Sequence, residues 1–99
     1  MPGVARQSDK STGHGCFAPT PITTSVASSV FTNGRRTAKV GSKCIPHKCG
    51  TTTHAGSTRA ISQGSGTVRV EGSPIARLGD RIACGDSVGQ ASGNVYAGG

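Results

Sequence analysis

The sequence predicts a small all-β domain in which short β-hairpins repeat with pseudo-threefold symmetry around one axis. Three observations predict this fold. The 99 residues include 16 Gly and 5 Pro, a proportion that helices tolerate poorly. A strand–turn–strand pattern occurs twice at a fixed offset. His or Cys residues follow equivalent positions of that pattern. We expect residues 1–99 to form one domain.

Two complete hairpins are predicted from an internal repeat. The segment Val30–Ser42 matches Val68–Asp80 at a constant offset of 38 residues. In both segments β-branched residues alternate before a glycine and apolar residues alternate after it, which is the period of a half-buried strand. Asn33-Gly34 and Glu71-Gly72 are the predicted turns, since Gly allows positive φ and Asn-Gly is a strong hairpin dipeptide.

A third hairpin is predicted from the two ends of the chain. Val4–Asp9 resembles the second half of a repeat unit, Ile75–Asp80, while Ser92–Tyr96 resembles the first half, Ser65–Arg69. A second half at the start and a first half at the end complete one unit only if the two ends meet. We therefore expect three similar units around one axis.

The segments between the units are rich in Thr, Ser, Gly and Pro. We expect Phe17–Ala27 and Gly50–Gln63 to be loops with little regular structure. No helix is expected, and a short helical turn within Asp80–Gly85 is the one alternative.

Composition and charge exclude several functions. With 32% hydrophobic residues, two Phe, one Tyr and no Trp, the chain cannot bury a thick core, and we expect no enzyme. Eleven Lys and Arg against four Asp and Glu give a net charge of +7, which attracts anionic surfaces. The basic residues are scattered and aromatic residues are few, so no nucleic-acid partner is expected.

No apolar run is long enough to span a membrane, and Met1–Lys10 lacks the apolar core of a signal peptide. We therefore expect synthesis in the cytosol. Since the cytosol keeps thiols reduced, the four Cys are expected to be thiols or metal ligands rather than disulfides.

A metal site is predicted where the repeat units end. His14 stands five residues after Asp9, His47 five after Ser42, and Cys84 four after Asp80. In a threefold arrangement these positions converge near the axis, and His54 is the natural fourth ligand of a closed tetrahedral site. The predicted ligands are His14, His47, His54 and Cys84. Zinc suits this donor set best, and iron is the alternative. Metal binding should release protons, and the affinity should fall in acid.

Other uses of the cysteines stay open at this point. Cys44, His47 and Cys49 place three donors within six residues, a spacing that also suits a local zinc knuckle, and Cys16 is a further candidate ligand. A disulfide between Cys44 and Cys49, or another pair, is the second alternative. Ordinary buried thiols and surface imidazoles are the third. The repeat register favours the first set, because Cys44 and Cys49 lack counterparts in the other units.

These residues together resemble the PAAR-repeat family. The repeated Ala-Arg-x-Gly-Asp element of that family is present in full at Ala76-Arg77-Leu78-Gly79-Asp80. The Pro-Ala-Ala-Arg hallmark is present at Ser73-Pro74-Ile75-Ala76-Arg77, with Ile75 in place of Ala. Four further elements match in order: His14-Gly15, His47-Lys48-Cys49, His54-Ala55-Gly56 and Cys84-Gly85. The resemblance covers essentially the whole chain, and the ordered set is what makes it specific.

The resemblance implies a small cone with zinc held by three His and one Cys, bound as one monomer on the blunt end of a trimeric β-helical spike. The expected function is the tip of a contractile phage tail, in the virion baseplate, which helps to pierce the host envelope and touches the outer membrane transiently. A type VI secretion spike tip or effector adaptor is the alternative, and a small zinc-binding module that interacts with nucleic acid or protein is the third interpretation. Spike contacts are not identified; Val30, Val68, Val95 and Tyr96 are candidates, although a core position is favoured for them.

Overall fold

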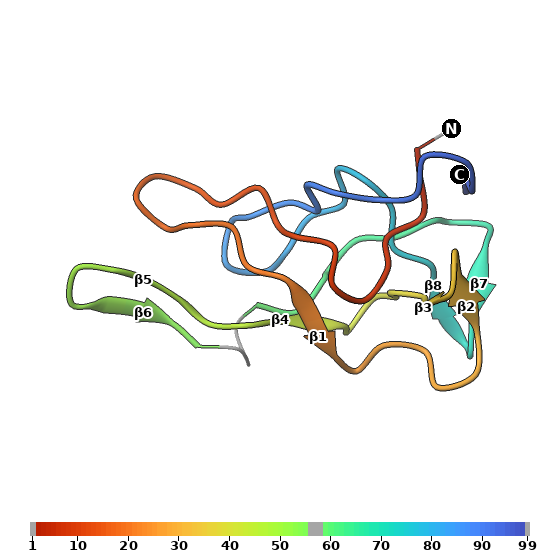
Figure 1. Ribbon diagram of the computed structural model, residues 1–99, viewed down its shortest axis with the longest axis horizontal. Coiled ribbons are helices and arrows are strands. Elements are labelled where there is room, and N and C mark those ends of the chain that lie inside the picture. Colours follow the sequence, from red (N-terminus) through yellow and green to blue (C-terminus); the bar gives the residue numbers. More distant parts are fainter. Residues whose placement is uncertain (1, 56–58, 99) are drawn as a thin grey trace.

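The computed structural model describes residues 2–55 and 59–98 and forms an elongated body of 38 × 23 × 23 Å (Figure 1). Short strands form two-stranded antiparallel sheets, β1 with β4, β2 with β3, β5 with β6 and β7 with β8. Their bounds are β1 Ile22–Thr24, β2 Phe31–Thr32, β3 Arg35–Arg36, β4 Lys43–Cys44, β5 His47–Cys49, β6 Thr52–His54, β7 Arg69–Val70 and β8 Ser73–Pro74. The described residues contain no helix, including at Asp80–Gly85, and the predicted all-β class is confirmed.

The two predicted complete hairpins are present. β2 pairs with β3 across the turn Asn33-Gly34, and β7 pairs with β8 across the turn Glu71-Gly72. All four turn residues have positive φ, between 51° and 82°. A two-residue turn with this backbone matches the right-handed twist of the strands, which explains why an Asn-Gly or Glu-Gly pair stands there.

The two ends of the chain complete a third unit, as predicted. The Val4 amide donates to the Val95 carbonyl at 2.9 Å, and the Ala97 amide donates to the Pro2 carbonyl at 3.1 Å. Figure 1 shows both termini at one end of the body, near the β2–β3 and β7–β8 hairpins and opposite the β5–β6 hairpin.

A ring of three alanines marks the pseudo-threefold axis. Ala5 donates its amide to the carbonyl of Ala76, Ala76 donates to Ala38, and Ala38 donates to Ala5, at 2.9, 3.1 and 2.9 Å. All three side chains are fully buried. The repeat needs alanine here because three equivalent side chains meet where the units are closest.

Equivalent turns follow the ring in each unit. A side-chain oxygen of Asp9, Ser42 or Asp80 accepts the backbone N–H three residues earlier, at 2.9, 3.0 and 2.7 Å. Ser42 thus accepts the same hydrogen bond as the Asp at the equivalent position of the other two units. Ser8 takes a φ of 79° where the other units have glycine, which costs roughly 1 kcal/mol in a residue that carries a Cβ.

The core is thin and lies around the alanine ring. One cluster contains the ring itself with Ile22, Ile61, Val88 and other small apolar residues. Ile22, Ile61 and Val88 are equivalent, because each accepts an amide from the turn of its own unit, at 2.9 Å in every case. A second cluster lies toward the termini and consists of Val4, Ala27, Val70, Ile75 and Ala97.

The favoured prediction that Val30, Val68, Val95 and Tyr96 lie in the core is wrong. Val30, Val68 and Val95 are 37–40% exposed, and Tyr96 is 51% exposed. Val30, Val68 and Val95 are equivalent, since each accepts the amide of the facing strand of its hairpin. The strands of the hairpins are only two residues long and end at the face that carries the termini. The three valines therefore lie outside the buried core.

The two segments predicted as loops each contain a strand. β1 lies within 17–27 and pairs with β4, where Ile22 faces Cys44. β6 lies within 50–63 and forms a hairpin with β5. Thr-rich composition was the reason for predicting loops, yet Thr is β-branched and suits a strand once a partner is available. Residues 56–58 of the second segment lie outside the described residues.

Candidate metal centre

Four short elements bring the predicted ligands together at the end of the body opposite the termini. His14 begins a tight turn that ends at Phe17. The N–H of each of these two residues donates to the carbonyl of the other. His47 begins β5 and His54 ends β6, so the register of this hairpin places them opposite one another. Cys84 lies in a turn that the amide of Gly85 closes onto the carbonyl of Ile82.

The side chains of His14, His47, His54 and Cys84 converge. One nitrogen or sulfur atom of each lies within 4.8 Å of the others. Nε2 of His47 is 2.8 Å from Nδ1 of His54 and 3.9 Å from Sγ of Cys84. Ligand atoms of a tetrahedral zinc site are about 3.3–3.8 Å apart, given bonds of about 2.0 Å to nitrogen and 2.3 Å to sulfur. The cluster therefore has the composition and nearly the spacing of such a site.

The outer ring nitrogens of two histidines already have acceptors. Nδ1 of His14 contacts a carboxylate oxygen of Asp86, and Nδ1 of His47 lies 3.0 Å from the carbonyl oxygen of Ala18. An acceptor at Nδ1 keeps the proton there and leaves the Nε2 lone pair free to bind a metal. This arrangement fits a metal ligated by neutral imidazoles.

Electrostatics also favour neutral imidazole. The pKa of His54 is lowered, first by desolvation and then by the neighbouring His47 and His14. A histidine that does not compete for a proton offers its lone pair to a cation.

Arg59 and Asp86 form a buried ion pair beneath the cluster, and the sequence did not reveal either of them. Both side chains are fully buried, and a guanidinium nitrogen of Arg59 contacts a carboxylate oxygen of Asp86. Burial acts to raise the pKa of Asp86, but hydrogen bonds from Ser11 and His14 and the charge of Arg59 outweigh it and lower the pKa. The only available clue was that Asp86 stands two residues after a predicted ligand.

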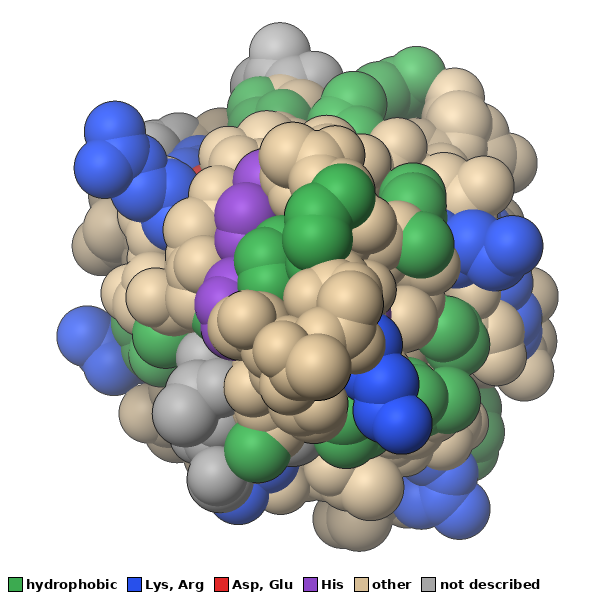
Figure 2. Space-filling view, turned by 90° about the vertical axis from the view of Figure 1, so that its left-hand side faces the viewer, with side chains coloured by type: hydrophobic (Ala, Val, Ile, Leu, Met, Phe, Trp, Pro, Cys, Tyr) green, Lys and Arg blue, Asp and Glu red, His purple; other side chains and the backbone are tan. Residues whose placement is uncertain are grey.

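Phe17 is a second neighbour that the sequence did not reveal. Its ring stacks on His54 at a centroid distance of 3.9 Å and lies 4.9 and 4.7 Å from His14 and His47. Figure 2 shows this end of the molecule, where His side chains are visible beside hydrophobic ones while Lys and Arg stand around the rim. The phenyl ring therefore shields the imidazoles from solvent.

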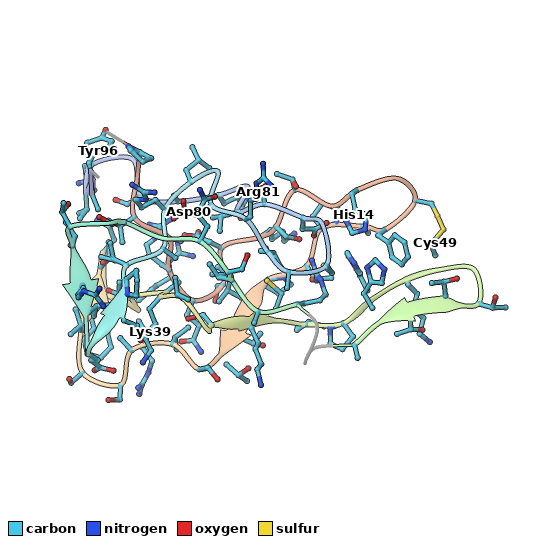
Figure 3. The ribbon with its side chains drawn as sticks, turned by 180° about the vertical axis from the view of Figure 1, so that it is seen from behind. His14, Lys39, Cys49, Asp80, Arg81 and Tyr96 are labelled. Atoms are coloured by element: carbon cyan, nitrogen blue, oxygen red, sulfur yellow. A yellow bond between two sulfur atoms is a disulfide. The ribbon has the colours of Figure 1, made fainter. Side chains whose placement is uncertain are left out.

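The remaining cysteines correct the expectation of reduced thiols. Cys16 and Cys49 form a disulfide with a Cα–Cα distance of 5.4 Å. The pairing arises because the His14–Phe17 turn and the β5–β6 hairpin extend to the same end, where Figure 3 shows Cys49 beyond His14. Cys44 is buried in the core, and burial raises the pKa of its thiol to about 11. The ligand group formed by the described residues includes neither Cys44 nor Cys49.

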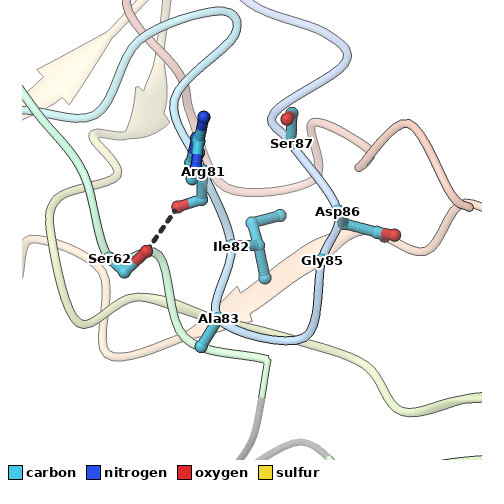
Figure 4. A pocket seen from close by; sticks show the side chains of 7 residues that line it. All are labelled: Ser62, Arg81, Ile82, Ala83, Gly85, Asp86 and Ser87. Atoms are coloured by element: carbon cyan, nitrogen blue, oxygen red, sulfur yellow. Dashed lines mark hydrogen bonds between the residues drawn. The ribbon is translucent and has the colours of Figure 1, made fainter.

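A surface pocket of about 510 Å³ lies beside the loop that carries Cys84. Figure 4 shows its lining residues, Ser62, Arg81, Ile82, Ala83, Gly85, Asp86 and Ser87. The Asp86 side chain points away from Ser62 and Arg81 in this view, and its carboxylate contacts Arg59 and His14. Asp86 therefore lines the pocket and also contacts a predicted ligand.

Fold and site together define a class of protein: an elongated all-β body of pseudo-threefold hairpins with a three-His, one-Cys cluster at one end. A family model for the PAAR motif matches residues 12–90, well over half of the chain. The chain belongs to the PAAR-motif family. A search of curated proteins found no match.

Family membership indicates a spike-tip role in contractile injection or type VI systems, in association with spike proteins. The proteins of this family are structural spike tips, and the His/Cys cluster is consistent with their binding of a metal ion. Within the described residues there is no helix of the length and hydrophobicity that a membrane crossing requires.

Proposed function

We propose that residues 1–99 form the metal-stabilised tip of the central spike of a contractile phage tail. One copy caps the blunt end of a trimeric β-helical spike and leads it through the host envelope. A type VI spike tip or effector adaptor is the alternative within the same class. The proposal rests above all on the polarity of the molecule, with donors for a metal at one end and a threefold apolar face at the other.

The apex end supports the proposal through its lack of packing. The β5–β6 hairpin and the turn at His14 extend away from the rest of the body (Figure 1), and neither core cluster includes any of their residues. We propose zinc as the ion, bound by His14, His47, His54 and Cys84. A structural zinc contributes on the order of 10 kcal/mol, comparable to the whole net stability of a small domain. Such an ion would make a narrow point rigid.

The opposite end supports binding to a trimer. Val30, Val68 and Val95 occupy equivalent positions around the axis marked by the alanine ring and remain exposed. Figure 3 shows Tyr96 at this end, remote from His14. A trimeric β-helix ends in unpaired strand edges, which a face with threefold order can cover.

Metal analysis tests the site directly. Elemental mass spectrometry of the purified protein should find one zinc per chain, and His14→Ala, His47→Ala, His54→Ala and Cys84→Ala should each lose it. Cys44→Ala and Cys49→Ala are the controls and should retain it; Cys49→Ala also opens the disulfide with Cys16, so Cys44→Ala is the matched one. Absence of metal from the wild type, or loss only in the two controls, would overturn the assignment. Iron in place of zinc would correct the metal alone.

Native mass spectrometry tests the partner. The chain is mixed with the trimeric β-helical region of a phage spike protein or, separately, of a type VI spike protein. One chain per phage trimer is the expected result. Binding only to the type VI trimer would establish the alternative, and binding to neither would contradict the spike-tip assignment.

A further inference from the structure

The Arg59–Asp86 pair is costly as a purely structural element. The side chains of both residues are fully buried. Removing two charges from water costs several kcal/mol per ion, and a buried ion pair is often no more stabilising than apolar residues of the same volume. A chain with so thin a core would gain more from apolar residues at these positions. What the pair contacts is therefore more informative than its net stability.

The guanidinium of Arg59 is held rigidly. Its Nε donates to Sγ of Cys84 at 3.3 Å. One terminal nitrogen donates to the Ile45 carbonyl at 2.6 Å and to the Thr20 hydroxyl, and the other donates to the Ser11 hydroxyl at 2.9 Å and to Asp86. Each of its five N–H groups thus has an acceptor, so the planar fork cannot rotate away from the sulfur.

The two oxygens of Asp86 serve different partners. Oδ2 accepts from Arg59, and Oδ1 accepts from Nδ1 of His14. The carboxylate therefore connects the guanidinium to one histidine of the cluster, while the guanidinium itself reaches the cysteine.

We propose that this ion pair is the positioning element of the metal centre and orients two of its four ligands at once. Arg59 directs and partly neutralises the Cys84 thiolate through Nε–H. Asp86 holds the His14 proton on Nδ1, so that Nε2 faces the metal. The inference rests on the proposed function, since it requires that the cluster binds a metal. Outer partners of this kind typically change metal affinity by about 10–100-fold.

Cobalt binding tests the proposal, because Co²⁺ occupies tetrahedral zinc sites and reports the thiolate through a sulfur-to-metal charge-transfer band. Arg59→Lys keeps the positive charge but loses the fork, and it should weaken Co²⁺ binding about 10–100-fold and move the band to lower energy. Arg69→Lys is the matched control, since it makes the same exchange at an exposed arginine of β7, at the end of the body opposite the ligand cluster. It should leave affinity and band unchanged.

Two further measurements cover Asp86 and the histidine. Asp86→Ala should weaken Co²⁺ binding about 10–100-fold, while Asp86→Asn, which keeps an acceptor for His14, should recover part of the loss. In the zinc-loaded wild type, ¹⁵N NMR should show His14 bound through Nε2 with a proton on Nδ1. This last measurement needs no variant and decides the Asp86 role even where a variant fails to fold.

The outcomes separate this inference from the function on which it rests. A wild type that binds no metal overturns both. A wild type that binds one Co²⁺, while Arg59→Lys and Asp86→Ala keep its affinity and its band, overturns the positioning role alone. His14 bound through Nδ1 also overturns the role of Asp86.

Discussion

The amide nitrogen of Ala38 lies 2.9 Å from the carbonyl oxygen of Ala5, and two equivalent bonds through Ala76 close a ring around the pseudo-threefold axis. The three side chains are fully buried, so there is no free volume for a larger residue.

Replacement of Ala76 by Val should destabilise the fold by about 1–3 kcal/mol, because added methyl groups strain a packed axis. Ala5→Val and Ala38→Val should cost similar amounts, since the positions are equivalent. Urea unfolding provides the measurement. Leu78→Ala, at a side chain 47% exposed, is the control and should change stability by no more than about 0.5 kcal/mol. Tolerance of Val at all three positions would show that the ring does not set the packing.

The repeat register explains why much of this fold could be predicted from sequence. A constant offset and glycines at the turns predicted both complete hairpins and the meeting of the termini. The same register predicted that His14, His47 and Cys84 come together, because equivalent loops leave equivalent positions, whereas His54 follows from the need of a tetrahedral site for a fourth ligand. That the four bind a metal stays a prediction.

What could not be predicted depends on contacts between loops that have no counterpart in the repeat. Arg59 reaches Cys84 and Asp86 across three segments, and no local pattern distinguishes it from the ten other basic residues. Cys16 and Cys49 are 33 residues apart, and only the parallel extension of their two loops brings them into contact. The exposure of Val30 follows from the depth of the hairpins, which alternation alone does not reveal.

The Cys16–Cys49 disulfide should stabilise the apex in addition to the metal ion. It closes a loop with a sequence separation of 33, which corresponds to about 3–4 kcal/mol in the chain-entropy model. A reducing agent should therefore lower the unfolding midpoint of the wild type and leave Cys16→Ser unchanged. Thiol labelling of the unfolded protein should find two free thiols without reductant, those of Cys44 and Cys84. Four free thiols in the purified protein, with no response to reductant, would contradict this stabilisation.

Phe17 should slow the loss of the metal without setting the number bound. Its ring covers three imidazoles, so Phe17→Ala should accelerate transfer of zinc to a chelator while elemental analysis still finds one ion per chain. The other phenylalanine is the natural control. Phe31 is 57% exposed and stacks near Arg36, and Phe31→Ala should leave the transfer rate unchanged. Equal rates in the two variants would argue against shielding.

Glu71 should make stability depend on pH in acid. Its carboxylate accepts the backbone amides of Ser28 and Ser29, and these bonds lower its pKa from 4.5 to about 2. Lys39 also faces it, with Nζ at 3.9 Å. Because the pKa is lower in the folded state, the stabilisation is complete above pH 4.5 and disappears as the pH falls toward 2.

Glu71→Gln should therefore lower stability near neutral pH and reduce the loss on acidification. Urea midpoints of the variant and the wild type should converge between about pH 5 and pH 2, whereas metal release at low pH affects both proteins alike. A difference between the two proteins that stays constant over this range would contradict the assignment.

The exposed valines should carry the contact with the spike. Val30, Val68 and Val95 are equivalent about the axis and 37–40% exposed, so a trimeric partner would cover all three at once. A carboxylate introduced at one of these positions would be buried in the interface without a partner. Val30→Asp, Val68→Asp and Val95→Asp should each weaken binding to the trimer by about 30-fold or more, the loss typical of a central interface residue. Leu78→Asp introduces the same charge at an exposed apolar side chain outside the ring of valines and should bind normally in the same titration. If Leu78→Asp weakens binding and the three valine variants do not, the spike contacts another face.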